Sequence, residues 1–200
     1  MIKSAKSETR NMTKIHLCSD FDLTITNFHT GGEYQVLARE DLKNPDLLLQ
    51  TFRKAIAEHY LSIVTFGESE AMVRETLKLI SLTEEEVAKV VVVTGLAEDK
   101  VGHIKEAYRR HGLLGEDDNL KVRFPIRTLL LEDDINNATS AAKGGACVLL
   151  SSDIEDCSHI ESALKILTNP STIDQECFNH ARVNNYRANL EQAGVILKAA

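Results

Sequence analysis

The stretch IHLCSDFDLTIT, residues 15–26, joins an apolar run to two closely spaced acids. The run Ile15–Ser19 has the length of a short buried strand, and it stops at Asp20, with Asp22 two residues later. Side chains at positions i and i+2 of a strand point to the same face, so both carboxylates can enter one crevice. Two like charges this close repel each other unless a cation or a proton lies between them. The stretch therefore predicts a buried strand that ends at a charged site.

Apolar runs alternate with stretches of helical periodicity along the chain. The expected strands are Ile15–Ser19, Leu61–Thr65, Val90–Thr94, Arg127–Glu132 and Cys147–Leu150. The expected helices are Pro45–Tyr60, Ser69–Ile80, a helix capped by Thr83, Lys100–His111 and Asn136–Lys143. Continuous apolar strands separated by helices are typical of parallel strands covered on both faces. The sequence thus predicts an α/β fold, a doubly wound, Rossmann-like parallel sheet with helices on both faces.

Polar residues stand at the carboxyl ends of these expected strands, where doubly wound sheets bind their ligands. The ends carry Asp20, Thr65, Thr94 and the pair Asp133-Asp134. The alternative is structural: Asp20 would cap a turn, and Asp133-Asp134 would cap the helix that follows. The two acidic ends together, with Thr65 and Lys100 in matching order, favour a binding site over capping.

The ligand types available favour a hard cation. Several carboxylates that enter one crevice suit Mg²⁺, which takes oxygen ligands and keeps waters or a substrate phosphate. None of the four cysteines forms a CxxC pair, and the seven histidines contain no HExxH motif. A softer metal therefore has no advantage, and Mg²⁺ is the expected cofactor.

Four motifs of this chain resemble those of the haloacid dehalogenase (HAD) superfamily of phosphotransferases, over residues 14–152. The first, a strand followed by DxDx[TV], corresponds to Asp20–Thr24. The second, a Ser or Thr that ends the next core strand, corresponds to Thr65 in SIVTFGES. The third, a Lys at the start of a helix, corresponds to Lys100, and the fourth, an acidic strand end, to Asp133 in LLLEDDINNATSA.

The resemblance implies a catalytic role for Asp20, Asp22, Thr65 and Lys100. Asp20 would be the nucleophile that forms an aspartyl-phosphate, and Asp22 would be the general acid and base. Thr65 would hydrogen-bond a phosphoryl oxygen, and Lys100 would neutralise charge on Asp20 and the phosphate. Asp20, Asp133 and the backbone carbonyl of Asp22 would bind the Mg²⁺ ion.

The chain departs from the family pattern at its fourth motif. Glu132 stands where the family has a glycine, and Asn137 stands where GDxxxD has its second acid. Which further acid tunes the metal therefore stays open. Asp134 is either an outer metal ligand or a helix cap, and we favour the cap. Lys105 is a rival for the role of Lys100, but it lies more than one turn into the helix.

The segment Asn27–Tyr34, NFHTGGEY, is expected to form either a flap over the crevice or an ordinary β-hairpin. Gly31-Gly32 would let it bend, and Phe28, His29 and Tyr34 are candidates to touch substrate. The expected substrate-binding residues are His29, Thr65, Phe66, Gly67 and Lys100.

The gaps between the motifs leave no room for a large cap domain. By resemblance, capless members often act on large substrates such as phosphoproteins or nucleic-acid ends. The formal net charge of −7 argues against a nucleic-acid partner. A phosphorylated protein or peptide is therefore the leading expectation, with phosphotyrosine as one candidate because an open slot suits a long, flat side chain. The alternatives are a small-molecule phosphatase, for a nucleotide or sugar phosphate, and a receiver-like or non-catalytic phospho-binding module.

The remaining expectations concern organisation and location. Residues 1–13 are expected to be a flexible arm, residues 14–170 the HAD-like catalytic core, and residues 171–200 a helical extension. No apolar run reaches the roughly 20 residues that cross a bilayer, so no membrane segment is expected. Cysteines inside strand-like runs indicate reduced thiols, hence the cytoplasm or another reducing compartment. The family resemblance adds delivery of a bacterial effector into a host cell.

Overall fold

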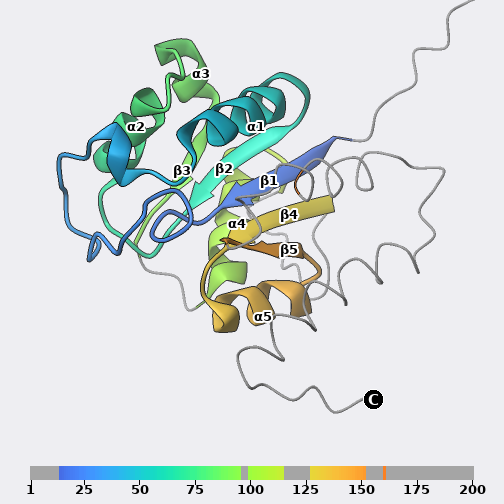
Figure 1. The fold of residues 1–200 in the computed structure, drawn as a ribbon. Helices are drawn as coiled ribbons and strands as arrows, with labels where there is room; N and C mark the ends of the chain where they lie inside the picture. The colour runs from blue at the N-terminus through green and yellow to red at the C-terminus, as the bar shows by residue number, and fades with distance from the viewer. Residues whose placement is uncertain (1–13, 96–98, 115–126, 152–159, 161–200) are drawn as a thin grey trace, which may run out of the picture.

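Parallel strands form a single five-stranded sheet in the computed structural model (Figure 1). The structure describes residues 14–95, 99–114, 127–151 and 160. The expected arm at residues 1–13 and the expected extension at residues 171–200 lie outside these ranges. The strands are β1 (Ile15–Ser19), β2 (Tyr60–Val64), β3 (Val91–Val93), β4 (Arg127–Glu132) and β5 (Cys147–Leu150).

The strand order β3-β2-β1-β4-β5 confirms the predicted doubly wound sheet. The chain proceeds outward from β1 to β3 and then returns to the other side of β1 with β4. The order therefore reverses between β1 and β4, and a ligand crevice is expected at their carboxyl ends. The same order disfavours a receiver domain, whose sheet has the order 2-1-3-4-5. A hydrogen bond from Asp20 N to Leu131 O (2.8 Å) joins β1 and β4 at this reversal.

Helices cover both faces of the sheet, as Figure 1 shows. They are α1 (Pro45–Glu58), α2 (Glu70–Leu79), α3 (Glu84–Lys89), α4 (Lys100–Arg110) and α5 (Ile135–Lys143). The alternation of side chains along β1 separates two cores. Leu17 packs in the core that contains Phe52 of α1, whereas Cys18 packs in the core that contains Tyr108 of α4. Side chains that share a face with Cys18 therefore meet α4 and α5.

Local capping explains where the helices begin. Pro45 occupies the first turn of α1, where its missing N–H costs nothing. Thr83 and Glu86 form a reciprocal capping box at the start of α3. The side chain of Asp99 accepts a hydrogen bond from Gly102 N, so α4 begins at Lys100, as the sequence predicts.

No large cap domain is evident between the strands in the described residues. Within the described ranges, only a short 3-10 helix, Arg39–Asp41, lies between β1 and α1. The segment Asn27–Tyr34 consists of turns and irregular backbone, so the β-hairpin alternative is wrong. Its glycines Gly31 and Gly32 both have positive φ, which explains why the segment turns instead of extending.

Two cysteines of the described residues lie in the cores of the sheet. Cys18 and Cys147 are buried, and burial raises the pKa of the Cys18 thiol far above its ordinary value. A thiol in this setting is unreactive. Cys157 and Cys177 lie outside the described residues. No helix in the described part of the chain combines the length and apolar character that crossing a bilayer requires.

Candidate active site at the β1–β4 reversal

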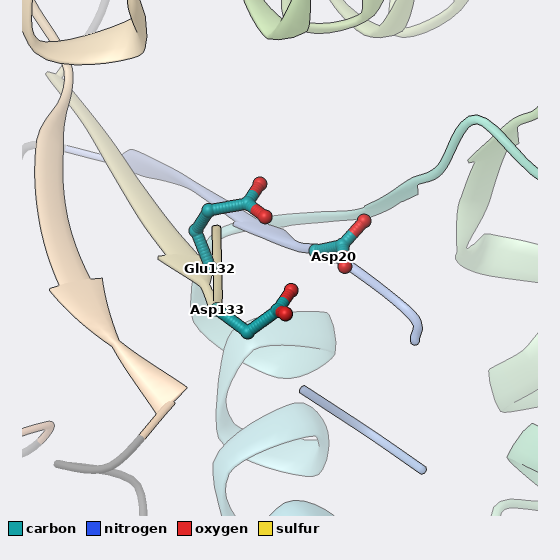
Figure 2. Close-up of side chains that lie close together, drawn as sticks. All are labelled: Asp20, Glu132 and Asp133. Atoms are coloured by element: carbon teal, nitrogen blue, oxygen red, sulfur yellow. The ribbon is translucent and has the colours of Figure 1, made fainter. Parts of the chain in front are cut away.

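Three carboxylates gather where β1 and β4 end. Asp20 follows β1, Glu132 is the last residue of β4, and Asp133 follows it. Figure 2 shows the three side chains close together, and one carboxylate oxygen from each lies within 4.8 Å of the other two. Strands β1 and β4 are neighbours in the sheet, so the reversal of strand order brings these distant residues to one place.

Lys100 extends from the first turn of α4 into this cluster. Its Nζ lies 2.5 Å from Asp20 Oδ1 and 3.2 Å from Glu132 Oε2. The same ammonium donates to the backbone oxygen of Val64 at 2.9 Å, at the end of β2. Lys100 is completely buried. One cation thus contacts two carboxylates and a carbonyl, and the rival Lys105 has no part in these contacts.

The charges of the cluster shift one another. Burial raises the pKa of Asp20 above its ordinary value, although the Lys100 ammonium opposes this shift. Burial and the nearby Asp20 charge also raise the pKa of Glu132. Burial alone would lower the pKa of Lys100, but the two carboxylates together raise it, so Lys100 is charged at neutral pH. In the described part of the chain these three carboxylates share the ammonium of Lys100, and an additional positive charge would relieve their repulsion.

The donor set fits a hard divalent cation. All three side chains offer carboxylate oxygens, the ligands that Mg²⁺ prefers. Glu132 Oε2 is buried and accepts no aligned hydrogen bond, although Lys100 Nζ lies 3.2 Å away. A buried oxygen whose lone pairs accept no aligned hydrogen bond has the capacity to bind a metal ion.

Asp22 lies apart from the three-carboxylate cluster. Strand β1 ends at Ser19, and a turn follows in which Leu23 has a left-handed φ of 54°. Asp22 therefore lies outside the strand, and strand alternation does not set the direction of its side chain. Its carboxylate turns instead toward the Asn27–Tyr34 segment, where Oδ1 accepts a hydrogen bond from the Thr30 hydroxyl at 2.8 Å. The expected metal contact through the Asp22 backbone carbonyl stays a prediction.

Thr65 and Phe66 border the cluster at the end of β2. The Thr65 hydroxyl oxygen accepts a hydrogen bond from Gly67 N at 3.2 Å, which closes a tight turn. The Phe66 ring meets the His103 ring edge-on, with centroids 4.6 Å apart, and Lys100 Nζ lies 4.9 Å from its centroid. Phe66 is 42% exposed. The Phe66 side chain is therefore solvent-exposed and lies next to the lysine that contacts Asp20.

The predicted flap places its aromatic side chains in different environments. Phe28 is half-buried and packs against the apolar core, and its contact with substrate stays a prediction. The side chain of His29 is 70% exposed, and its Nδ1 lies 3.8 Å from Asp22 Oδ2. Tyr34 is half exposed, and its hydroxyl donates to Glu75 of α2 at 2.7 Å.

The flap is also joined to the loop that carries Thr65. The backbones of Gly32 and Gly67 are so close that a Cβ on Gly67 would lie 3.3 Å from the Gly32 Cα. Glu68 N donates to Gly32 O at 3.1 Å, and Gly95 N donates to Gly67 O at 2.9 Å. The loops that follow β1, β2 and β3 thus form one connected rim around the carboxyl ends of the strands.

Two residues of the site lie outside the set that the sequence predicts. The position of Glu132 could have been predicted from the sequence, because alternation along β4 puts its side chain on the same face as that of Leu130, toward α4. Thr30 carried no local signal, since its contact with Asp22 depends on the path of an irregular loop. Asp134 is the cap of α5, because its side chain accepts from the backbone of Asn136 and Asn137.

Comparisons with known proteins support the fold. The crystal structure of the Legionella pneumophila effector Ceg4 is similar, with a TM-score of 0.52 and 15% identity, over 78% of this chain and 95% of Ceg4. A weaker likeness, with a TM-score of 0.41 and 15% identity, is to 3-deoxy-D-manno-octulosonate 8-phosphate phosphatase from Moraxella catarrhalis, solved with magnesium, phosphate and KDO. It covers 89% of this chain and 92% of that phosphatase. No protein-family model matches the sequence, and the search of curated proteins gives no significant match.

The fold and the site together define a class: a doubly wound α/β domain with an acidic, lysine-containing crevice at the reversal of its strand order. At 15% identity, the likeness to Ceg4 concerns the fold alone. The residues of the crevice therefore determine which chemistry this chain can perform.

Proposed function

We propose that this chain is a Mg²⁺-dependent phosphomonoester hydrolase that forms an aspartyl-phosphate on Asp20. The contact between Asp20 and the buried Lys100, at 2.5 Å and beside the acids of β4, is the observation that carries the proposal. Phosphoryl transfer needs an anionic nucleophile held among positive charges, and this arrangement supplies the nucleophile and the first of those charges.

The proposed reaction has two steps with balanced proton transfers. A carboxylate oxygen of Asp20 attacks phosphorus, the bond to the leaving oxygen breaks, and Asp22 gives that oxygen a proton. Water then attacks the phosphorus of the aspartyl-phosphate, Asp22 takes the water's proton, and the bond to Asp20 breaks to release phosphate. Thr65 hydrogen-bonds a phosphoryl oxygen, and Lys100 neutralises charge on Asp20 and the phosphoryl group.

The metal would be held by Asp20, Asp133 and the backbone carbonyl of Asp22, with Glu132 as a further carboxylate within reach. When bound, Mg²⁺ supplies the positive charge that lets an anionic nucleophile approach an anionic phosphate.

For the substrate we propose a phosphorylated protein or peptide, with phosphotyrosine as one candidate. The exposed large apolar side chains among the described residues are Phe66, Tyr34 and Val36, at 42%, 50% and 86% exposure. They belong to the two connected loops that join at Gly32 and Gly67. An open rim with apolar side chains can contact peptide residues on either side of a phosphate, whereas it buries little of a small ester.

The proposal includes the location. Buried thiols agree with a reducing compartment. Ceg4 is a bacterial effector, and we extend delivery into a host cell to this chain as part of the proposal.

Phosphate release from a panel of esters tests the proposal. We expect hydrolysis of an aryl phosphate in Mg²⁺, and loss of activity in excess EDTA or in the Asp20→Asn variant. Asp46→Asn is the matched control, because Asp46 is an exposed acid in the first turn of α1. Borohydride reduction should convert the aspartyl-phosphate on Asp20 to homoserine with loss of phosphate, and homoserine at this position would identify the intermediate. Undiminished activity of Asp20→Asn, or in EDTA, would refute the mechanism.

The same panel tests the substrate. We expect kcat/KM for the best phosphopeptide to exceed that for mononucleotides and sugar phosphates by roughly tenfold, because only a peptide reaches the rim. A mononucleotide or sugar phosphate that surpasses every peptide would replace the protein substrate with the small-molecule alternative.

A further inference from the structure

Thr30 is the buried residue of an otherwise open segment. Within Asn27–Tyr34 its neighbours are exposed or half-buried, whereas Thr30 is only 3% exposed. A hydroxyl is buried without cost only when its hydrogen bonds are satisfied. Thr30 Oγ1 satisfies this condition with two partners, Asp22 Oδ1 at 2.8 Å and Gly32 N at 3.3 Å.

The chemistry of these partners fixes the direction of each hydrogen bond. Gly32 N–H can only donate, so the Thr30 oxygen accepts there. The single hydroxyl proton of Thr30 is then directed to Asp22 Oδ1. Among the described residues the other oxygen, Asp22 Oδ2, has no hydrogen bond, and His29 Nδ1 lies 3.8 Å away, beyond hydrogen-bond distance. The two oxygens of Asp22 are therefore not equivalent, and Oδ2 is the one left free to carry a proton.

The loop holds Thr30 from both sides. The side-chain amide of Gln35 donates to the Thr30 carbonyl at 2.6 Å. Glu68 N donates to Gly32 O, which connects the same loop to the end of β2. The position of the hydroxyl is thus determined by backbone that does not depend on Asp22.

We propose that Thr30 is a positioning residue that orients the Asp22 carboxylate and leaves Oδ2 as the oxygen that protonates the leaving group. This inference rests on the proposed function, in which Asp22 is the general acid. An aspartate whose side chain rotates freely spends much of its time in unproductive orientations, and small misplacements of a reacting group are costly. Loss of the Thr30 hydroxyl should therefore weaken proton transfer and leave the attack by Asp20 intact.

Leaving-group dependence tests this inference. Thr30→Val keeps the shape of the side chain and removes the hydroxyl, and Thr30→Ser keeps the hydroxyl. For phosphomonoesters of alcohols, Thr30→Val should lower kcat/KM by roughly tenfold or more, since general acid catalysis contributes on the order of 100-fold or more. For 4-nitrophenyl phosphate, whose leaving group departs without a proton, the loss should stay within about twofold. Thr30→Ser should restore most of the difference between the two ester types.

A matched control and a double variant complete the design. Thr76→Val removes a buried hydroxyl that donates to Met72 O within α2. This variant should leave kcat/KM unchanged for both types of ester. In the Asp22→Asn background, Thr30→Val should add no further leaving-group effect, because the two residues act as a unit. Circular dichroism melting checks the folding of each variant, and Thr30→Ala gives the same readout if Thr30→Val does not fold.

The outcomes separate this inference from the proposed function. If Asp22→Asn affects both ester types equally, the general-acid role of Asp22 is wrong. If Asp22→Asn shows the leaving-group effect and Thr30→Val does not, only the role of Thr30 is wrong. Equal losses on both esters in Thr30→Val, or no restoration by Thr30→Ser, would reduce Thr30 to a structural residue of the loop.

Discussion

Replacing Glu132 with glutamine removes one buried carboxylate and keeps the size of the side chain. Ionised Glu132 is attracted by the Lys100 ammonium, 3.2 Å away, and is repelled by Asp20 and Asp133, with oxygens within 4.8 Å. At an effective dielectric constant of about 20, the attraction is about 5 kcal/mol and each repulsion is at least about 3.5 kcal/mol. The two repulsions therefore exceed the attraction by about 2 kcal/mol, so ionised Glu132 destabilises the metal-free fold. The desolvation of the buried carboxylate increases this destabilisation.

We therefore expect Glu132→Gln to stabilise the metal-free fold by about 2 kcal/mol at a pH above about 8, where folded Glu132 is ionised. The Asp134 N–H, which donates to Glu132 Oε1 at 3.2 Å, keeps an acceptor in the glutamine carbonyl. The gain should grow with pH. Burial raises the pKa of Glu132 from its ordinary value of 4.5 to about 8, so over this pH range the unfolded chain loses its proton while the folded chain keeps it. The wild type loses stability over that range, and the variant does not.

Urea unfolding in EDTA, repeated with Mg²⁺, measures both effects. Bound Mg²⁺ should stabilise the wild type more than the variant, because the variant has one carboxylate fewer near the ion. Glu106→Gln is the control, since among the described residues Glu106 pairs with Arg109 and Arg110 of α4, away from the cluster. A Glu132→Gln variant that is less stable than the wild type in EDTA would refute the reasoning. It would mean that the attraction to Lys100 outweighs the two repulsions.

Two further predictions concern the sheet and the rim. Burial, with His111 nearby, lowers the pKa of His16 to about 3, so the unfolded chain takes up a proton below pH ~6.5 and the folded chain does not. Stability should therefore fall by about 1.4 kcal/mol per pH unit from this site below pH ~6.5, and urea unfolding of His16→Gln should show a correspondingly flatter pH dependence. Changing the exposed His29 and Tyr34 to Ala should narrow the advantage of phosphopeptides over small esters, with turnover of a small aryl phosphate nearly unchanged. An equal loss on peptides and on the aryl phosphate would instead place these side chains in the chemistry or the fold.

Periodicity was sufficient to predict the sheet and the positions of its helices. The strand expected at Ile15–Ser19 has those bounds, and the strand expected at Val90–Thr94 is shortened to Val91–Val93. Strand ends are less certain because the last residues leave the ladder to enter turns. The helix expected at Lys100–His111 ends one residue early, at Arg110.

The site residues that directly follow strands could be predicted from the sequence. The positions of those in irregular loops could not. Asp20 and Asp133 follow strands, so the fold class alone places them at one edge of the sheet. Asp22 lies in a turn with a left-handed residue at Leu23, and no period describes the direction of its side chain. Its contact with Thr30 arises from tertiary structure, eight residues along the chain.

The position of Lys100 depends on both halves of the chain. Asp99 Oδ1 accepts from Gly102 N and caps α4, which makes Lys100 the first helical residue. The other carboxylate oxygen, Asp99 Oδ2, accepts from the Ser140 hydroxyl of α5 at 2.9 Å. Because α5 begins just after the acidic end of β4, this hydrogen bond ties the start of α4 to the strand that supplies Glu132 and Asp133. A cap residue thereby holds the lysine against Asp20, so the site depends on an aspartate that touches none of its reacting groups.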